Sequence, residues 1–119
     1  MSAHEKINYV EFPTQDLAAT KEFFAAVFGW KFQDYGEEYV AFFNAGLNGG
    51  FFLSEQHSSA KNGAVLVVFY SEYLEGTQDK IKQAGGTITQ PTFSFPGGRR
   101  FHFTDPNDNE FAVWSDKTL

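Results

Sequence analysis

An internal repeat is the feature that most constrains this sequence. The second half of the chain matches the first at an offset of 57 residues, which aligns Phe12 with Phe69, Leu17 with Leu74, Thr20 with Thr77, Phe24 with Ile81 and Gly29 with Gly86. Because this offset is close to half of the 119 residues, the pattern predicts two copies of one supersecondary unit. A chain of this length forms one domain with one core, so we expect the two copies to pack together.

Both halves have the same expected order of elements, which is a strand, a helix and three further strands. Asp16 is the expected N-cap of the first helix, Ser71 or Glu72 is expected near the start of the second, and glycines at 29 and at 85–86 end the helices. The first half has strands at 8–12, 30–35, 39–44 and 50–54 around a helix at 17–28. The second half has strands at 65–70, 87–93, 99–104 and 111–115 around a helix at 74–84.

These elements predict an α+β fold of two tandem βαβββ modules in a single domain, residues 1–119. The modules span about 6–55 and 64–116, and a connector of about 56–63 joins them. Strands this short need partner strands and a covering layer. We therefore expect a curved mixed sheet around a cleft, with the helices on the convex side.

Composition narrows the classes of function. Fifteen acidic against nine basic residues give a net charge of −6 and a pI near 4.9, which disfavours a nucleic acid partner. The chain has no cysteine, so disulfides, thiolate metal sites and cysteine nucleophiles are excluded. The sequence shows no export signal and no apolar run long enough to span a membrane, so we expect a cytoplasmic protein without a membrane partner.

Fifteen phenylalanines are more than a small core needs, so we expect aromatic side chains to line a cleft. Side chains alternate along a strand, and we expect the apolar partners of each strand to pack beneath the helices. The opposite positions then face the cleft. They are Tyr9, Glu11, Leu66, Val68, Tyr70, Arg100, His102, Glu110, Ala112 and Trp114. A mostly apolar cleft with a few polar groups is typical of small-molecule sites.

His102 and Glu110 are the candidate catalytic residues. They lie on neighbouring expected strands, and a histidine between the carboxylates of Glu11 and Glu110 can act as a general acid or base. Two alternatives stay open: a hydrogen-bonded His102 without a chemical role, and a metal site formed by His102, Glu110 and Glu11. Arg100 or its neighbour Arg99 would either bind an anionic group or pair with Glu110 or Asp108.

Two segments give the chain a family resemblance. The first is NYVEFPTQDL at residues 8–17, followed by Phe23-Phe24 and Phe28-Gly29-Trp30, and the second is FHFTDPNDN at residues 101–109, followed by FAVW at 111–114. Together they resemble the vicinal oxygen chelate superfamily, which includes glyoxalase I, bleomycin-resistance and fosfomycin-resistance proteins and extradiol dioxygenases. The resemblance covers nearly the whole chain and implies the same two-module fold.

The resemblance also allows a test of the family's metal site. Its enzymes hold a divalent metal with His, Glu or Gln on the first and fourth strands of each module, where the metal stabilises an oxyanion. Here those positions hold Tyr9, Leu66 (or Val65), residues 50–53 and Ala112, none of which is a usual ligand. We therefore expect no metal site and no cofactor.

The resemblance then implies a glyoxalase- or bleomycin-resistance-like protein that binds a small, partly apolar or aromatic molecule, and that pairs as a homodimer. One alternative is a lyase similar to lactoylglutathione lyase, or a dioxygenase, with Ni, Zn, Mn or Fe held by displaced ligands. The other is a metal-free proton-transfer enzyme that uses His102. Ligand, pathway and dimer geometry are beyond prediction from these residues.

Overall fold

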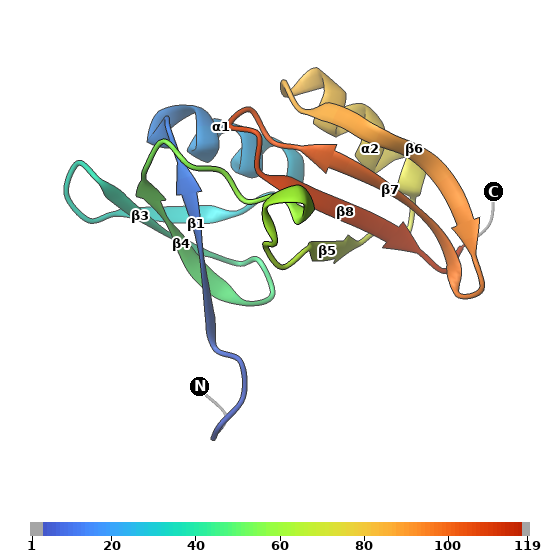
Figure 1. Ribbon diagram of the computed structural model, residues 1–119, viewed down its shortest axis with the longest axis horizontal. Coiled ribbons are helices and arrows are strands. Elements are labelled where there is room, and N and C mark those ends of the chain that lie inside the picture. The colour runs from blue at the N-terminus through green and yellow to red at the C-terminus, as the bar shows by residue number, and fades with distance from the viewer. Residues whose placement is uncertain (1–3, 118–119) are drawn as a thin grey trace.

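The computed structural model describes residues 4–117 and shows two βαβββ modules (Figure 1). The first contains β1 (Tyr9–Thr14), α1 (Leu17–Phe28), β2 (Lys31–Asp34), β3 (Tyr39–Phe43) and β4 (Asn48–Leu53). A connector with the short 3₁₀ helix η1 (Ala60–Asn62) follows. The second contains β5 (Val67–Tyr70), α2 (Leu74–Gln83), β6 (Thr87–Phe95), β7 (Gly98–Thr104) and β8 (Glu110–Ser115). Neither α1 nor α2 has the length and apolar character that crossing a membrane requires.

Hydrogen bonding divides the strands into two four-stranded mixed sheets. Sheet 1 has the order β1-β4-β3-β2 and sheet 2 the order β5-β8-β7-β6. In each sheet the first strand pairs in parallel with the last strand of its module, and the other pairs are antiparallel. The predicted α+β architecture of two modules is therefore confirmed, and the two sheets repeat the same topology.

The start of each helix shows the same repeat at atomic detail. Before α1, the Thr14 hydroxyl accepts from the Asp16 N–H and contacts the Thr20 hydroxyl at 2.7 Å. Before α2, the Ser71 hydroxyl accepts from the Tyr73 N–H and contacts the Thr77 hydroxyl at 2.7 Å.

Of the two α-helices, only α1 has a side-chain cap at its start. As predicted, Asp16 caps α1, where its Oδ1 accepts from the Ala19 N–H at 3.0 Å. The N-cap of α2 is Tyr73, which provides no cap bond, and Ser71 and Glu72 lie just before the helix, near its start as predicted. The Ser71 hydroxyl does not reach the first turn, because it accepts from the N–H of Tyr73.

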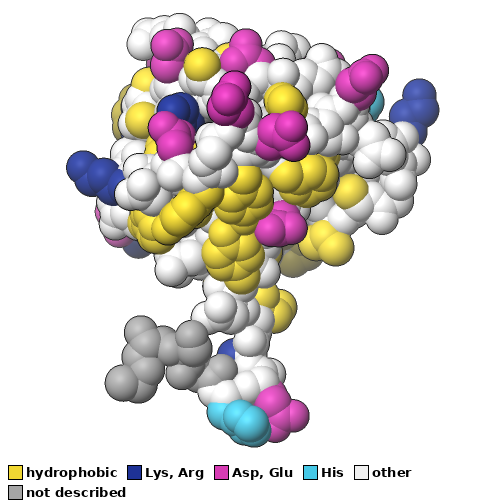
Figure 2. Space-filling view, turned by 90° about the vertical axis from the view of Figure 1, so that its left-hand side faces the viewer, with side chains coloured by type: hydrophobic (Ala, Val, Ile, Leu, Met, Phe, Trp, Pro, Cys, Tyr) yellow, Lys and Arg dark blue, Asp and Glu magenta, His cyan; other side chains and the backbone are white. Residues whose placement is uncertain are grey.

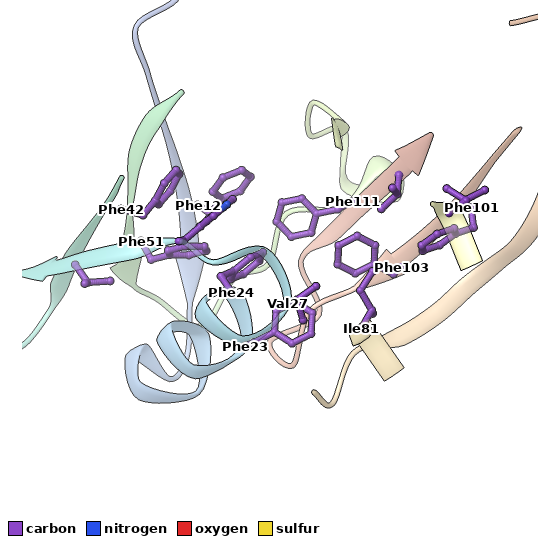
Figure 3. Close-up of a cluster of buried hydrophobic side chains, with 14 residues drawn as sticks. Phe12, Phe23, Phe24, Val27, Phe42, Phe51, Ile81, Phe101, Phe103 and Phe111 are labelled. Carbon is purple, nitrogen blue, oxygen red and sulfur yellow. The ribbon is translucent and has the colours of Figure 1, made fainter. Parts of the chain in front are cut away.

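One aromatic core serves both modules, with α1 at its centre (Figure 3). From α1, Phe24 contacts Phe51 of sheet 1 with ring centroids 5.4 Å apart, and Phe23 contacts Phe103 of sheet 2 at 6.2 Å. The inner faces of the two sheets also meet directly, since Phe12 and Phe111 lie 5.2 Å apart. Because the inner faces share one core, the opposite faces of the sheets point away from each other.

The turn between β7 and β8 joins the modules through buried polar groups. The buried Asp105 carboxylate accepts from the N–H groups of Asn107 and Asn109, each at 2.9 Å. The Asn107 side chain donates to the Thr20 hydroxyl at 2.9 Å, and the Asn109 side chain donates to the Pro13 carbonyl at 2.7 Å. Burial raises the pKa of Asp105 to about 6, although the hydrogen bonds that its carboxylate accepts from Asn107 and Asn109 oppose this rise.

Candidate functional site

Each sheet exposes a largely aromatic outer face. We define the first outer face by Tyr9, Glu11, Tyr39, Phe43 and Phe52 of sheet 1. The second outer face is defined by Val68, Tyr70, Phe93, Arg100, His102, Glu110 and Trp114 of sheet 2. The apolar members of both faces keep much of their surface in solvent, with Phe52 36% exposed and Tyr70 47% exposed. Figure 2 shows the side of the molecule that sheet 1 forms, where hydrophobic side chains gather beside acidic ones.

A chain of hydrogen bonds lies on the first outer face. The Tyr9 and Tyr39 hydroxyls are 2.5 Å apart, and the Tyr39 hydroxyl donates to Glu11 Oε2 at 3.0 Å. Tyr39 reaches Glu11 across β4, where Gly50 leaves the space, because a Cβ atom there would lie 2.0 Å from the Tyr39 oxygen. Partial burial and the bonds to Tyr9 and Glu11 raise the pKa of Tyr39 well above its ordinary value.

The two candidate catalytic residues lie together on the second outer face. His102 Nδ1 is 3.5 Å from Glu110 Oε2, and Arg100 Nη2 is 2.8 Å from His102 Nε2. A guanidinium can only donate, so His102 Nε2 accepts from Arg100 and the ring proton lies on Nδ1, toward Glu110. Glu110 also accepts from the Ala60 N–H of the connector at 2.7 Å, which fixes the carboxylate.

Aromatic rings surround this polar group. Arg100 lies over the Phe93 ring, 5.7 Å from its centroid, and the Phe93 and His102 rings are 6.0 Å apart. Tyr70 and Trp114 meet edge to face at 5.2 Å. The Tyr70 hydroxyl donates to the Asp116 carboxylate at 2.5 Å, and this bond raises the pKa of Tyr70 to about 12.

The structure brings some predicted partners together and separates others. Glu11 bonds to Tyr39 on the first outer face, so within one chain it lies across the core from His102 and Glu110. The expected ion pairs of the arginines with Glu110 or Asp108 are also absent among residues 4–117. Arg99 pairs instead with Glu75 of α2, and Arg100 contacts His102.

Two predicted cleft residues have little free surface for a ligand. Leu66 is half-buried and precedes β5, and Ala112 is fully buried between its strand neighbours His102 and Val68. Sequence reasoning missed Tyr39 and Phe52. The signal for Tyr39 was Gly50, a residue without a side chain in the middle of a strand, which often marks the close approach of another group.

Comparison with known proteins decides the family. The profile of the Glyoxalase/Bleomycin resistance protein/Dioxygenase superfamily matches residues 6–113. The chain belongs to this superfamily. No curated protein sequence matches the chain significantly.

Solved structures of the superfamily share the fold at low sequence identity. The fosfomycin resistance protein FosX from Listeria monocytogenes is 19% identical with a TM-score of 0.78, over 98% of this chain and 97% of that one. A glyoxalase-related enzyme from Fulvimarina pelagi is 16% identical with a TM-score of 0.77, over 93% and 88%. Lactoylglutathione lyase from Agrobacterium tumefaciens is 16% identical with a TM-score of 0.70, over 95% of each chain. These similarities show the fold.

The residues at the superfamily's metal positions do not fit a divalent cation. Tyr9 offers a hydrogen-bonded phenol, Leu66 and Ala112 have no donor atom, and the outer positions within residues 50–53 of β4 are Gly50 and Phe52. Within residues 4–117, no three His, Asp or Glu side chains are grouped so that they could hold a metal ion. Hard and borderline cations prefer carboxylate or imidazole ligands, which these positions lack.

Proposed function

We propose that this superfamily member binds a small, partly aromatic molecule on its outer faces, without the metal that related enzymes use. The observation that carries the proposal is the set of half-exposed aromatic side chains around few polar groups on both outer faces. Such a lining is typical of small-molecule sites, where aromatic contacts supply affinity and a few polar groups orient the ligand. The unsuitable donor set at the family's metal positions supports the metal-independent form of the proposal.

The proposed site includes a second copy of the chain. Within one chain the two outer faces point away from each other, so neither is covered on both sides. A homodimer with two-fold symmetry brings the first outer face of one copy opposite the second outer face of the other, in two equivalent clefts. Each cleft would then contain Glu11 from one copy and Arg100, His102 and Glu110 from the other.

A fluorescence titration tests the proposal. In Trp30→Phe, Trp114 of the second outer face is the one remaining tryptophan, so its emission reports binding there. We expect 2-naphthoate or 2-naphthylamine to change this emission in protein treated with EDTA. Phe52→Ala should weaken binding about tenfold, because it removes a buried aromatic contact from the opposite face of the cleft. Tyr73→Ala is the matched control, since Tyr73 is an exposed aromatic residue at the start of α2, outside both sheets.

Binding that required added Mn(II), Zn(II), Ni(II) or Fe(II) would contradict the metal-independent proposal. A FosX variant from Listeria monocytogenes has been solved with Mn(II) and dihydroxypropylphosphonic acid, so this outcome has a structural precedent within the fold. It would favour a lyase or dioxygenase with a displaced metal site that includes Glu11 of one copy and His102 and Glu110 of the other.

The contact of His102 with Glu110 favours one second candidate, a metal-free proton transfer. In that reaction a substrate would replace Arg100 at Nε2, and His102 would accept the substrate's proton while Glu110 stabilises the imidazolium. One variant distinguishes the two candidate functions, binding alone and metal-free proton transfer. His102→Gln would abolish turnover of a bound compound and leave its affinity within about twofold, whereas a protein that only binds would show no turnover to lose.

A further inference from the structure

A cavity of about 490 Å³, partly open to solvent, lies between the inner face of sheet 1 and the edge strand β5. Its walls are mainly the apolar side chains Val10, Phe12, Trp30, Phe42, Val67 and Phe69. The exposed residues Leu47 and Val68 mark its mouth. This volume is large enough for a small ring compound, since ligand pockets of proteins commonly begin near 300 Å³.

Two residues with polar side-chain groups line this space, Tyr70 at the rim, whose hydroxyl bonds to Asp116, and Trp30. Trp30 is only 6% exposed, and its indole N–H donates to no group among residues 4–117. Every fully buried side-chain nitrogen or oxygen in this part of the chain has a hydrogen-bond partner. The indole N–H therefore belongs to the small accessible part of Trp30. Trp30 itself lines the cavity.

We infer that this cavity is a second binding site, which takes a neutral, apolar ring compound with one hydrogen-bond acceptor, such as an aryl ketone. No charged side chain lines the cavity, and a charged ligand would lose its hydration without a partner. Its ring would pack against Phe12, Phe42 and Phe69, and its carbonyl oxygen would accept from the Trp30 indole. A ring that covers this N–H would displace water from it, and a carbonyl on the ligand would replace that water, because an N–H buried without a partner is costly.

This site is independent of the proposed function. Its walls come from the inner face of sheet 1 and from β5, whereas the proposed cleft uses the outer faces. Only Val68 and Tyr70 lie at both places, at the rim of the cavity. Variants that change Tyr39 or Glu11 on the first outer face therefore leave the cavity unchanged.

The test uses the fluorescent aryl ketone prodan and its matched analogue 2-dimethylaminonaphthalene, which lacks the carbonyl. With Trp114→Phe, Trp30 is the only tryptophan and its emission reports the cavity. With saturating 2-naphthoate present to occupy the outer cleft, which its charge keeps out of the cavity, we expect one prodan per chain, quenching of Trp30 and a blue-shifted prodan emission. Removing the indole N–H with Trp30→Phe should weaken prodan roughly three- to tenfold and the analogue by less than twofold, as the net value of one hydrogen bond implies.

Two further variants separate the cavity from the outer faces. Val67→Phe should fill the cavity and abolish prodan binding, with its fold checked by circular dichroism and thermal unfolding. Tyr39→Phe should leave prodan binding unchanged. The inference is overturned if the folded protein does not bind prodan, or if Trp30→Phe weakens both probes equally. It is also overturned if Tyr39→Phe, rather than Val67→Phe, removes binding, because the probe would then occupy the outer cleft.

Discussion

At the scale of single residues, Asp105 gives the protein a defined pH dependence. The raised pKa, about 6 against an ordinary value of 3.8, means that the folded state binds more protons than the unfolded state between about pH 4 and pH 6. The contribution of the Asp105 carboxyl to the free energy of unfolding is therefore fully present below pH 4. It is lost as the pH rises through 6. About two pKa units correspond to about 3 kcal/mol.

The measurement is the free energy of unfolding by urea, for the natural chain and for Asp105→Asn, from pH 4 to pH 7. Asparagine keeps an oxygen acceptor for the two backbone N–H groups but does not titrate. The difference between the two proteins should change by about 3 kcal/mol across this range, in favour of the variant at higher pH. A difference that is independent of pH would contradict the assignment.

Gly50 and Tyr39 give a second residue-scale prediction. In Gly50→Ala the new Cβ atom would displace the Tyr39 ring, so Tyr39 would lose its bond to Glu11 and its pKa would fall toward the ordinary range. Ultraviolet titration should then show one more tyrosine ionising near pH 10 than in the natural chain. Tyr39→Phe is the control, since it lacks that phenol. An unchanged titration in Gly50→Ala would show that Gly50 is not required for the position of Tyr39.

At the scale of elements, the repeat offers a matched pair of helix-cap variants. Tyr73 occupies the position in α2 that Asp16 occupies in α1, and it makes no cap bond. Tyr73→Asp should therefore raise the free energy of unfolding by about 1 kcal/mol, and Asp16→Ala should lower it by about the same amount. Thermal or urea unfolding measures both. A decrease for Tyr73→Asp would mean that the Tyr73 ring, which covers Gly76, contributes more than a cap would.

Local signals account for the elements that were predicted well. Helix α1 has the predicted bounds because its start and stop both depend on adjacent residues, Asp16 and Gly29, the latter with a positive φ of 72°. Strand β1 extends two residues past its predicted end, through Pro13. A proline is tolerated there because β1 is an edge strand, so its missing N–H removes no ladder bond on the open side.

At the scale of the whole molecule, long-range packing limits what the sequence can predict. Alternation along each strand predicted which side chains share a face of one sheet. It did not predict how the two sheets are oriented, because that depends on contacts such as Phe28 with Phe69, whose rings stack 4.2 Å apart. These contacts place α1 between the sheets and turn the outer faces apart. Glu11 and His102 were expected in one cleft. Because of this packing, they lie on opposite sides of one chain.

The proposed homodimer can be tested with cysteines, since the natural chain contains none. Thr104 is the strand partner of Glu110 and shares its face, so the double variant Glu11→Cys/Thr104→Cys places one thiol on each outer face. A short bismaleimide should join two copies of this variant into a covalent dimer of twice 13.4 kDa. Each single variant is the control and should give little dimer, because its thiols lie in different clefts. A double variant that stays monomeric after cross-linking would contradict a cleft shared between copies.

The metal content of the purified protein shows directly whether it holds a divalent cation. Untagged protein would be incubated in turn with Ni(II), Zn(II), Mn(II) and Fe(II), desalted, and measured by elemental mass spectrometry. Since the superfamily's ligand positions hold a phenol and apolar side chains, we predict no metal retained in stoichiometric amount. One metal ion per chain, or one per pair of chains, would contradict the account and would point to Glu11, His102 and Glu110 as ligands.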